Sequence, residues 1–245
     1  APELLSRGDV SSQLQSPATK LSFEMTAPYL AHACMEPMNC TVHVQEGRID
    51  VWVPCQGNTL VVENIVKALK VDPAIVRVTR TYLGGDFGRR SDAEYAAQAA
   101  LIAKAVNRPV KLIWSREEDI RQDFYRPISK VRMTAVVDDR GVLQAWDILN
   151  AAPSISKRRF PQQIKDGKDP SSLAGFGDQP YNLEHLRVRS RIVDTGIPVG
   201  FWRSVNHGQN IFYRESMLNE LAARAGLDGM AYRRLLLDGN DRYLA

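Results

Sequence analysis

Features that place a chain in a specialised class are scarce in this sequence. Cysteine occurs only at Cys34, Cys40 and Cys55, with no CxxC pair, so reduced structural thiols are expected and no zinc or iron–sulfur spacing is present. No apolar run reaches the length of a membrane span. No charged start followed by an apolar core marks a signal peptide. The chain also begins without Met, which predicts a piece of a longer protein.

An excess of one charge is equally modest. The formal net charge is +4, from 32 Lys and Arg against 28 Asp and Glu, and the arginines are scattered. The two small clusters are Lys157–Arg159 and the alternating Arg187, Arg189 and Arg191, whose spacing is typical of one solvated face of a strand. Basic and aromatic residues do not interleave. A nucleic-acid or phosphate binder is therefore the weakest of three functional hypotheses, and no nucleic-acid partner is expected.

Hydrophobic patterning indicates an ordinary globular chain. Its 245 residues, 44% of them hydrophobic, suffice for one large or two modest cores. Alternation predicts hairpins over 41–53 and 130–149 and strands over 75–81 and 185–193. Helical spacing predicts helices over 58–70, 91–106, 209–225 and 230–237. Hairpins mixed with helices favour an α+β fold with mixed sheets and packed helices. The expected boundaries are a linker over 1–20, a first unit over 21–150 and a partial second unit over 151–245.

One glycine-rich stretch links a predicted strand to a predicted helix. Gly84, Gly85 and Gly88 allow a sharp turn and a close approach of backbone to a ligand. Ser91 and Glu94 have the spacing of a capping box, and the helix that follows places one stripe inward, at Tyr95, Ala99, Ile102 and Val106. Free N–H groups at a helix start favour polar or anionic ligand atoms. Most such loops are only turns, and the spacing matches neither the dinucleotide fingerprint nor a Walker loop.

Several stretches together resemble one known family. They are Pro28–Pro37, Gly84–Arg89, Arg108–Asp119 and Gly200–Gln209, the last continuing through Glu215 to Ala222. In this order they resemble the molybdenum-binding large subunit of the xanthine dehydrogenase/aldehyde oxidase family. The Trp-Arg-Ser-Val form of the last motif is most similar to isoquinoline 1-oxidoreductase-type enzymes. The resemblance covers about Leu21 to Asn240, and the four motifs in the family's order are specific.

The resemblance implies a chemistry that the composition alone does not. Members hydroxylate aldehydes or N-heteroaromatic carbons with water-derived oxygen. They hold molybdenum on a molybdopterin, commonly the cytosine dinucleotide form in bacteria, and pass electrons to [2Fe-2S] clusters. This chain has no cluster-binding cysteines, so the clusters are expected on a small partner subunit. The expected substrate is a small aromatic heterocycle or an aldehyde.

The resemblance also implies cofactor-binding residues in both glycine loops. These are Gly84, Gly85, Asp86, Phe87, Gly88 and Arg89 in the first loop and Gln209 at the end of the second. Asp86 stands where many relatives have a third glycine, and Phe87 is expected mainly to pack within its loop. For Gln209 a polar role at a helix start is equally open.

Two further residues match positions near the family's substrate. Arg203 is implied to stabilise negative charge on a substrate oxygen, with a salt-bridged arginine as the alternative. Glu36 is implied to orient the substrate, with the capping of a nearby loop as the alternative. His32 and His207 lack partners at metal spacing and are expected to be hydrogen-bonded structural residues.

The family's essential base is a glutamate far toward the C-terminus, and nothing after Asn240 resembles its segment. The sequence thus predicts a fragment of the large subunit that neither turns over nor keeps a cofactor by itself. The missing remainder of the subunit is then a partner. The competing hypothesis is a non-catalytic binding or assembly module that kept the fold.

Overall fold

The computed structural model of the protein describes residues 1–244, except for the side chains at positions 241 and 244. The chain forms two compact units, each assembled from separate segments. Unit 1 contains Ala1–Leu30, Pro127–Val199 and Ser204–Ala245, and unit 2 contains Ala31–Arg126 and Gly200–Arg203. This division differs from the boundaries predicted at 20 and 150. The reason is that strands from the first thirty residues pair with strands beyond residue 127.

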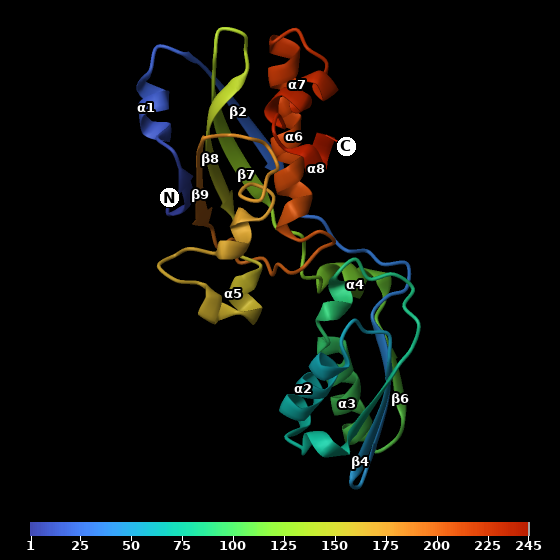
Figure 1. The fold of residues 1–245 in the computed structure, drawn as a ribbon. Coiled ribbons are helices and arrows are strands. Elements are labelled where there is room, and N and C mark those ends of the chain that lie inside the picture. Colours follow the sequence, from blue (N-terminus) through green and yellow to red (C-terminus); the bar gives the residue numbers. More distant parts are fainter. Residues whose placement is uncertain (245) are drawn as a thin grey trace. The chain divides into compact units, whose positions relative to one another are not determined.

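Unit 1 is built on a five-stranded sheet with the strand order β1-β9-β8-β7-β2 (Figure 1). Neighbouring strands are antiparallel except β8 and β9, which run parallel. A parallel pair needs a long crossover, and residues 153–184 supply it between these two strands. The strands are β1 (Glu3–Arg7), β2 (Thr19–Ala27), β7 (Ser129–Val137), β8 (Leu143–Ala152) and β9 (His185–Ile192).

Helix α6 packs on this sheet, and α7 packs against α6 (Figure 1). The buried stripe of α6 includes Tyr213, Met217 and Leu221. The indole nitrogen of Trp146 on β8 lies 3.0 Å from the Met217 sulfur. This face of the sheet therefore holds the core of unit 1. The helices are α1 (Val10–Gln15), α5 (Ser156–Arg159), η3 (Pro161–Gln163), η4 (Pro170–Leu173), α6 (Asn206–Arg224), α7 (Gly229–Leu236) and α8 (Asp241–Leu244).

Two groups of polar contacts hold the helices of unit 1 in place. The Tyr232 hydroxyl of α7 donates to the Gly141 carbonyl (2.9 Å) and accepts from the Leu143 amide (3.0 Å). The Glu215 carboxylate of α6 accepts hydrogen bonds from three donors, Tyr181, Arg214 and Arg233. Burial raises the pKa of the Tyr232 phenol to about 12, so it stays neutral and keeps both hydrogen bonds.

The predicted linker over 1–20 is wrong. Residues Glu3–Arg7 form an edge strand paired with β9, and Val10–Gln15 form a helix whose start is capped by Asp9. The Ser- and Gln-rich composition of this segment carries no strong periodicity. Its structure instead comes from backbone pairing with residues about 180 positions away, which local patterning does not report.

Unit 2 is a four-stranded sheet with the order β5-β4-β3-β6. The β3–β4 hairpin is antiparallel, whereas β4 and β5 are parallel and connected through α2. Helices α2 and α3 supply the apolar side chains that form the core with the sheet. The elements are β3 (Asn39–Gln45), β4 (Arg48–Val53), α2 (Asn58–Leu69), η1 (Pro73–Ile75), β5 (Val76–Arg80), η2 (Arg89–Ser91), α3 (Glu94–Val106), β6 (Val110–Ile113) and α4 (Arg116–Arg121).

The predicted capping box and part of the predicted stripe of α3 are wrong. The cap position is Ala93, and the Ser91 hydroxyl donates to the Gly88 carbonyl instead (2.7 Å). Tyr95 and Ala99 are buried as expected, but Ile102 and Val106 are exposed. The inward face consists mostly of alanines because α3 lies close against the sheet and α2. The α+β class with mixed sheets and packed helices is confirmed.

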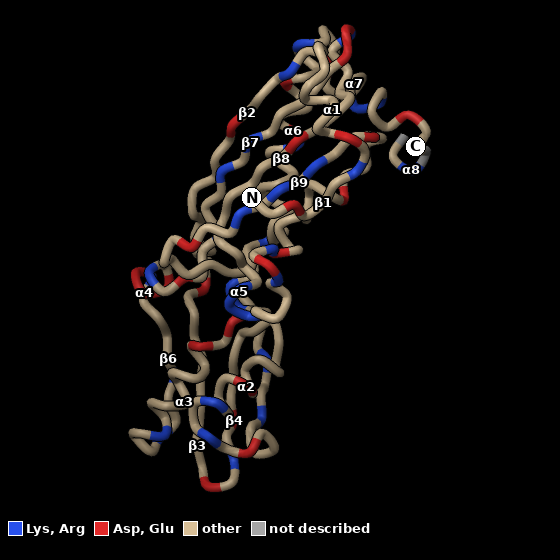
Figure 2. Tube along the Cα trace, turned by 90° about the vertical axis from the view of Figure 1, so that its left-hand side faces the viewer, with Lys and Arg blue, Asp and Glu red and all other residues tan. Residues whose placement is uncertain are grey.

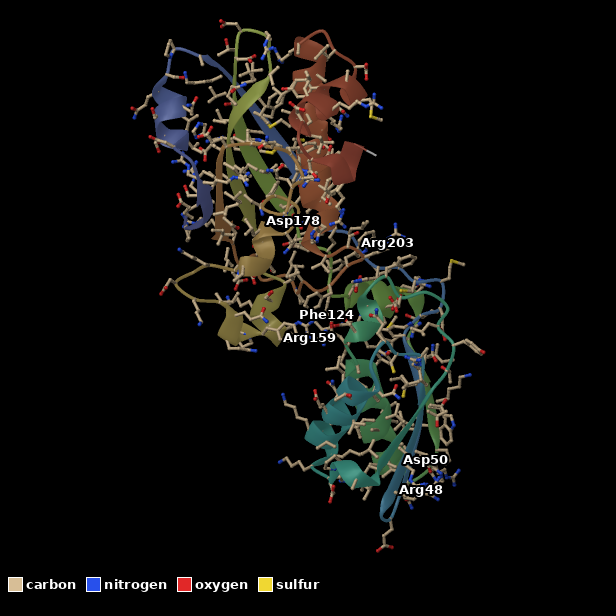
Figure 3. The ribbon with its side chains drawn as sticks, in the orientation of Figure 1. Arg48, Asp50, Phe124, Arg159, Asp178 and Arg203 are labelled. Atoms are coloured by element: carbon tan, nitrogen blue, oxygen red, sulfur yellow. The ribbon has the colours of Figure 1, made fainter. Side chains whose placement is uncertain are left out.

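Charged residues of both signs are interspersed along the chain (Figure 2). The alternating arginines lie on β9 as predicted, and two of them, Arg187 and Arg189, pair with Asp147 on the neighbouring strand. A pair with a more exposed arginine joins Arg48 and Asp50 on β4 (Figure 3). Asp147 thus pairs with two of the three alternating arginines.

Candidate functional site

The glycine loop of unit 2 connects β5 to the short helix η2. Its backbone takes positive φ at Gly85 (95°), Phe87 (50°) and Gly88 (110°). The Gly88 amide donates to the Asp86 carboxylate (2.7 Å), and the Arg89 amide donates to the Asp86 carbonyl (2.8 Å). Asp86, which stands in place of a third glycine, thus fixes the turn from within.

Three consecutive amides of this loop are left open. The backbone N–H groups of Gly85, Asp86 and Phe87 make no hydrogen bond within the described part of the chain. Negative φ at Asp86 between positive values at its neighbours is the alternation that forms anion-binding concavities in backbone. Amides held in this way can donate to an oxo, phosphate or carboxylate oxygen without reorganisation.

Glu36 and Arg90 fix the start of the loop through side-chain contacts. The Glu36 carboxylate accepts from the Gly84 amide (2.7 Å) and lies 3.0 Å from a guanidinium nitrogen of Arg90, whose side chain is fully buried. Arg90 also donates to the carbonyls of Gly85 and Pro54. The contacts of Glu36 therefore match the loop-capping alternative. Arg90 was not recognised from the sequence, where only its position after Arg89 could have suggested a structural role.

The Gly84 position needs glycine because a side chain there would overlap Glu36. A Cβ atom on Gly84 would lie 2.5 Å from the Glu36 Cβ. The absence of a side chain therefore lets the amide reach the carboxylate, and this contact ties the start of the loop to the segment before β3.

The side chain of Arg89 points into the interior of unit 2. Its Nε lies 3.1 Å from the Asp123 carboxylate, another nitrogen pairs with Glu94, and its guanidinium lies over the Phe124 ring at 4.9 Å. Burial lowers the pKa of Arg89, but the hydrogen bond and charge of Glu94, together with Asp123, outweigh it and raise the pKa above its ordinary value. Arg89 is thus charged, and its buried side chain is directed away from any ligand of the loop.

The segment Gly200–Arg203 lies against this loop within unit 2. The Phe201 carbonyl occupies the space that a side chain on Gly88 would fill, because a Cβ there would lie 1.8 Å from that oxygen. The Trp202 ring stacks on Phe87, with centroids 6.4 Å apart and planes inclined by 17°. The structure therefore brings together the first loop and the start of the second. Arg203 follows in an exposed position (Figure 3).

Gln209 lies in unit 1, in the first turns of α6. It is only 3% exposed, and its side-chain oxygen has no hydrogen-bond partner among the described residues. The helix starts after positive φ at Ser204 and Val205, without a side-chain cap. A buried amide oxygen without a partner is costly, so Gln209 is a candidate for a ligand contact rather than a helix-start residue.

The two histidines are hydrogen-bonded, as the sequence predicts. His32 contacts Asp123 and the Phe201 carbonyl, and His207 lies 2.6 Å from the Asp178 carboxylate. No group of His, Cys, Asp and Glu with the geometry of a metal site occurs in the described residues. None of the described helices is long and apolar enough to cross a bilayer.

The three cysteines are buried and unpaired. Burial raises the pKa of Cys34 to about 11 and that of Cys40 to about 12. The thiolate is the reactive form, so these thiols are unreactive core residues, as expected from their number and spacing.

Comparisons with known proteins cover almost the whole chain. Residues 2–237 match the family described as the molybdopterin cofactor-binding domain. The chain is 31% identical over 244 residues to the membrane-bound aldehyde dehydrogenase [pyrroloquinoline-quinone] of Gluconacetobacter polyoxogenes, covering 95% of this chain and 31% of that protein. It is 28% identical over 226 residues to isoquinoline 1-oxidoreductase subunit beta of Brevundimonas diminuta, covering 90% of this chain and 29% of that protein.

A solved structure shares the fold. Quinoline 2-oxidoreductase from Pseudomonas putida 86 superposes with a TM-score of 0.80 at 18% identity, covering 95% of this chain and 30% of that one. The chain thus spans about 30% of the length of these relatives.

Proposed function

Because this chain belongs to the molybdopterin cofactor-binding domain family, we propose that it forms part of a molybdenum hydroxylase. The substrate is an aldehyde or an N-heteroaromatic compound, the added oxygen comes from water, and electrons pass to [2Fe-2S] clusters on a small partner subunit. The names of its relatives, an aldehyde dehydrogenase and an isoquinoline oxidoreductase subunit, support these two substrate classes. The observation that carries the proposal is the run of open amides in the glycine loop.

The residues present fit a molybdopterin cofactor. In unit 2, the amides of Gly85, Asp86 and Phe87 are donors for its polar, charge-bearing atoms. In unit 1, considered by itself, Gln209 has a buried oxygen that still needs a donor. We assign the cytosine dinucleotide form on the resemblance alone. When bound, the cofactor supplies the two-electron redox chemistry of the hydroxylation. The chain's own residues hold and orient it.

Arg203 and Glu36 take different parts in this proposal. Arg203 is exposed and donates to a substrate oxygen that gains negative charge, for which a guanidinium is well suited. Glu36 already accepts from Gly84 and Arg90. Its carboxylate therefore acts on the substrate only indirectly, by fixing the loop that borders it.

The chain supplies one part of the complete site. Its relatives are about three times as long, and we propose that the general base and the remaining cofactor contacts lie outside residues 1–245. The isolated chain is then expected neither to turn over nor to retain molybdenum. The alternative is a non-catalytic assembly module, which the open amides and the partnerless Gln209 oxygen do not favour, since such a module needs neither.

The test is metal analysis of the full-length parent protein, purified with its partner subunits. We expect one molybdenum and one releasable cytosine nucleotide per large subunit. We also expect dye reduction with an aldehyde or a heteroaromatic substrate, and incorporation of oxygen from labelled water. A folded, pure protein that carries a quinone and no molybdenum would contradict the proposal. A molybdenum-free protein that still pairs with an iron–sulfur subunit would support the assembly module.

A matched pair of variants separates cofactor binding from folding. Gln209→Met replaces a buried, partnerless amide by an apolar group of similar size, so the free energy of unfolding should stay equal or rise. Molybdenum content should fall, because the ligand contact is lost. Gln163→Met, at an exposed position of the same unit, is the control and should change neither quantity. Full molybdenum occupancy in Gln209→Met would show that Gln209 does not contact the cofactor.

A further inference from the structure

We propose that His32 is a positioning residue that holds the second segment of the site against the first. It donates a hydrogen bond to the Phe201 carbonyl and thereby sets the path of Gly200–Arg203 beside Gly88. The inference concerns the shape of these segments of unit 2 and holds for whatever ligand they bind.

The His32 ring is fixed at both of its nitrogens. Nδ1 lies 2.8 Å from the Asp123 carboxylate, and Nε2 lies 3.0 Å from the Phe201 carbonyl oxygen. Each ring nitrogen thus has an acceptor oxygen within hydrogen-bond distance, and the Phe201 carbonyl can only accept. The side chains of His32 and Asp123 are each 2% exposed. Hydrogen bonds to charged groups in such a dry setting are among the stronger ones.

Asp123 connects this contact to the glycine loop. Its second carboxylate oxygen accepts from the His32 amide (2.6 Å), so the histidine is held through backbone as well as side chain. The oxygen that contacts the ring also lies 3.1 Å from Nε of Arg89, which is in turn paired with Glu94. One buried carboxylate therefore anchors both the residue after Gly88 and the histidine that holds Phe201.

The Phe201 carbonyl is confined from two sides. His32 donates a hydrogen bond to it on one side. On the other side the oxygen fills the space that a side chain on Gly88 would need. The next ring, Trp202, stacks on Phe87, whose amide is one of the three open donors. A shift of the carbonyl would therefore move Trp202 and the neighbouring Arg203 relative to the open amides.

Two substitutions separate the two hydrogen bonds of the ring. In His32→Gln the side-chain amide can reach the position of Nε2 and still donate to Phe201. In His32→Asn the amide reaches only the position of Nδ1 and can donate only to Asp123. A role in packing alone predicts that both variants behave alike, whereas a role in holding Phe201 predicts rescue by glutamine.

The measurement is hydrogen exchange of the full-length protein, followed by mass spectrometry. The Gly200 amide donates to the Tyr125 carbonyl (3.1 Å), so it exchanges when this segment moves. We expect about tenfold faster exchange of Gly200 in His32→Asn, corresponding to loss of one buried hydrogen bond, and near wild-type exchange in His32→Gln. Exchange of β3 and β4 should be unchanged, which shows that unit 2 is folded. Equal exchange in both variants, or no change in His32→Asn, would overturn the proposal.

A second variant keeps the test valid if His32→Asn does not fold. Asp123→Asn keeps the side-chain shape but removes the charge shared by His32 and Arg89. It should speed exchange in both 84–90 and 200–203, whereas faster exchange in neither segment would contradict the network. If the variants show these exchange patterns while the wild-type full-length protein has no hydroxylase activity, the proposed function is refuted and the positioning role stays intact.

Discussion

Replacing Gly88 by alanine tests the contact between the two segments of the site. At φ 110° an L-residue is disfavoured by about 1–2 kcal/mol. The new Cβ would lie 1.8 Å from the Phe201 carbonyl oxygen and 2.8 Å from its carbon. Both are backbone atoms, so the segment itself must move, which adds about 1–3 kcal/mol of overpacking strain. We expect Gly88→Ala to lower the free energy of unfolding of unit 2 by about 2–5 kcal/mol.

Gly47→Ala is the matched control for this substitution. Gly47 also has positive φ (67°) and lies in the β3–β4 turn of the same unit, but nothing lies within 4 Å of its added Cβ. Gly47→Ala should lower the free energy of unfolding by only about 1 kcal/mol, from backbone conformation alone. Alanine restricts the unfolded chain equally in both variants, so their difference isolates the contact with Phe201.

The assay is urea unfolding of each variant, followed through the transition of unit 2. Two compact units can unfold in separate transitions, so a single global midpoint is not sufficient. Hydrogen exchange then assigns the transition, because Gly88→Ala should expose 200–203 before the sheet. If the free energies of unfolding of Gly88→Ala and Gly47→Ala differ by less than about 0.5 kcal/mol, the Phe201 carbonyl does not lie as close to position 88 as the structure places it.

Three further substitutions test contacts away from this segment. Tyr232→Phe leaves two buried backbone groups unpaired and should lower the free energy of unfolding by about 2 kcal/mol; an unchanged urea midpoint would contradict this. Burial alone would raise the pKa of Glu215, but its hydrogen-bond donors outweigh burial and hold the pKa below 4.5. Its contribution to stability is therefore complete above pH 4.5 and lost as pH falls through the folded pKa. Glu215→Gln should weaken the decrease of the free energy of unfolding at acid pH. An unaltered pH profile would show that the Glu215 carboxylate does not contribute to this decrease. Glu36→Gln removes the partner charge of the buried Arg90 and should lower the stability of unit 2 by about 2 kcal/mol. If Glu36 instead contacts substrate, the variant would raise KM without a change in stability.

The sequence predicted much of the local structure because the relevant signals are short-range. Alternation identified the β3–β4 and β7–β8 hairpins, and helical spacing identified α2, α6 and α7. The α3 prediction was right about the helix but wrong about its start and half of its stripe. Ser91 and Glu94 have local spacing for a cap, yet each found a better partner, the Gly88 carbonyl and Arg89 respectively.

The division into units could not be predicted from local patterns. Unit 2 takes four residues, Gly200–Arg203, from a stretch whose neighbours on both sides belong to unit 1. Only pairing over long sequence separations, such as β1 with β9 and β2 with β7, shows which segments share a core. Composition and turn signals mark where elements end and carry no information about which sheet a strand joins.

For the site, the sequence by itself determined the glycine loop and the family to which it belongs. Glycines at 84, 85 and 88 permit the backbone turn whatever surrounds them, and four motifs in order identify the family. Only the tertiary structure decided which groups stay open. It brings the charged Glu36 and Arg90 side chains against the loop and joins His32 to Phe201, which lie 169 positions apart in the sequence. Hydrogen-bond donors are satisfied by neighbours in space, so the open amides of 85–87 became recognisable only once the partners of the Gly84, Gly88 and Arg89 amides were known.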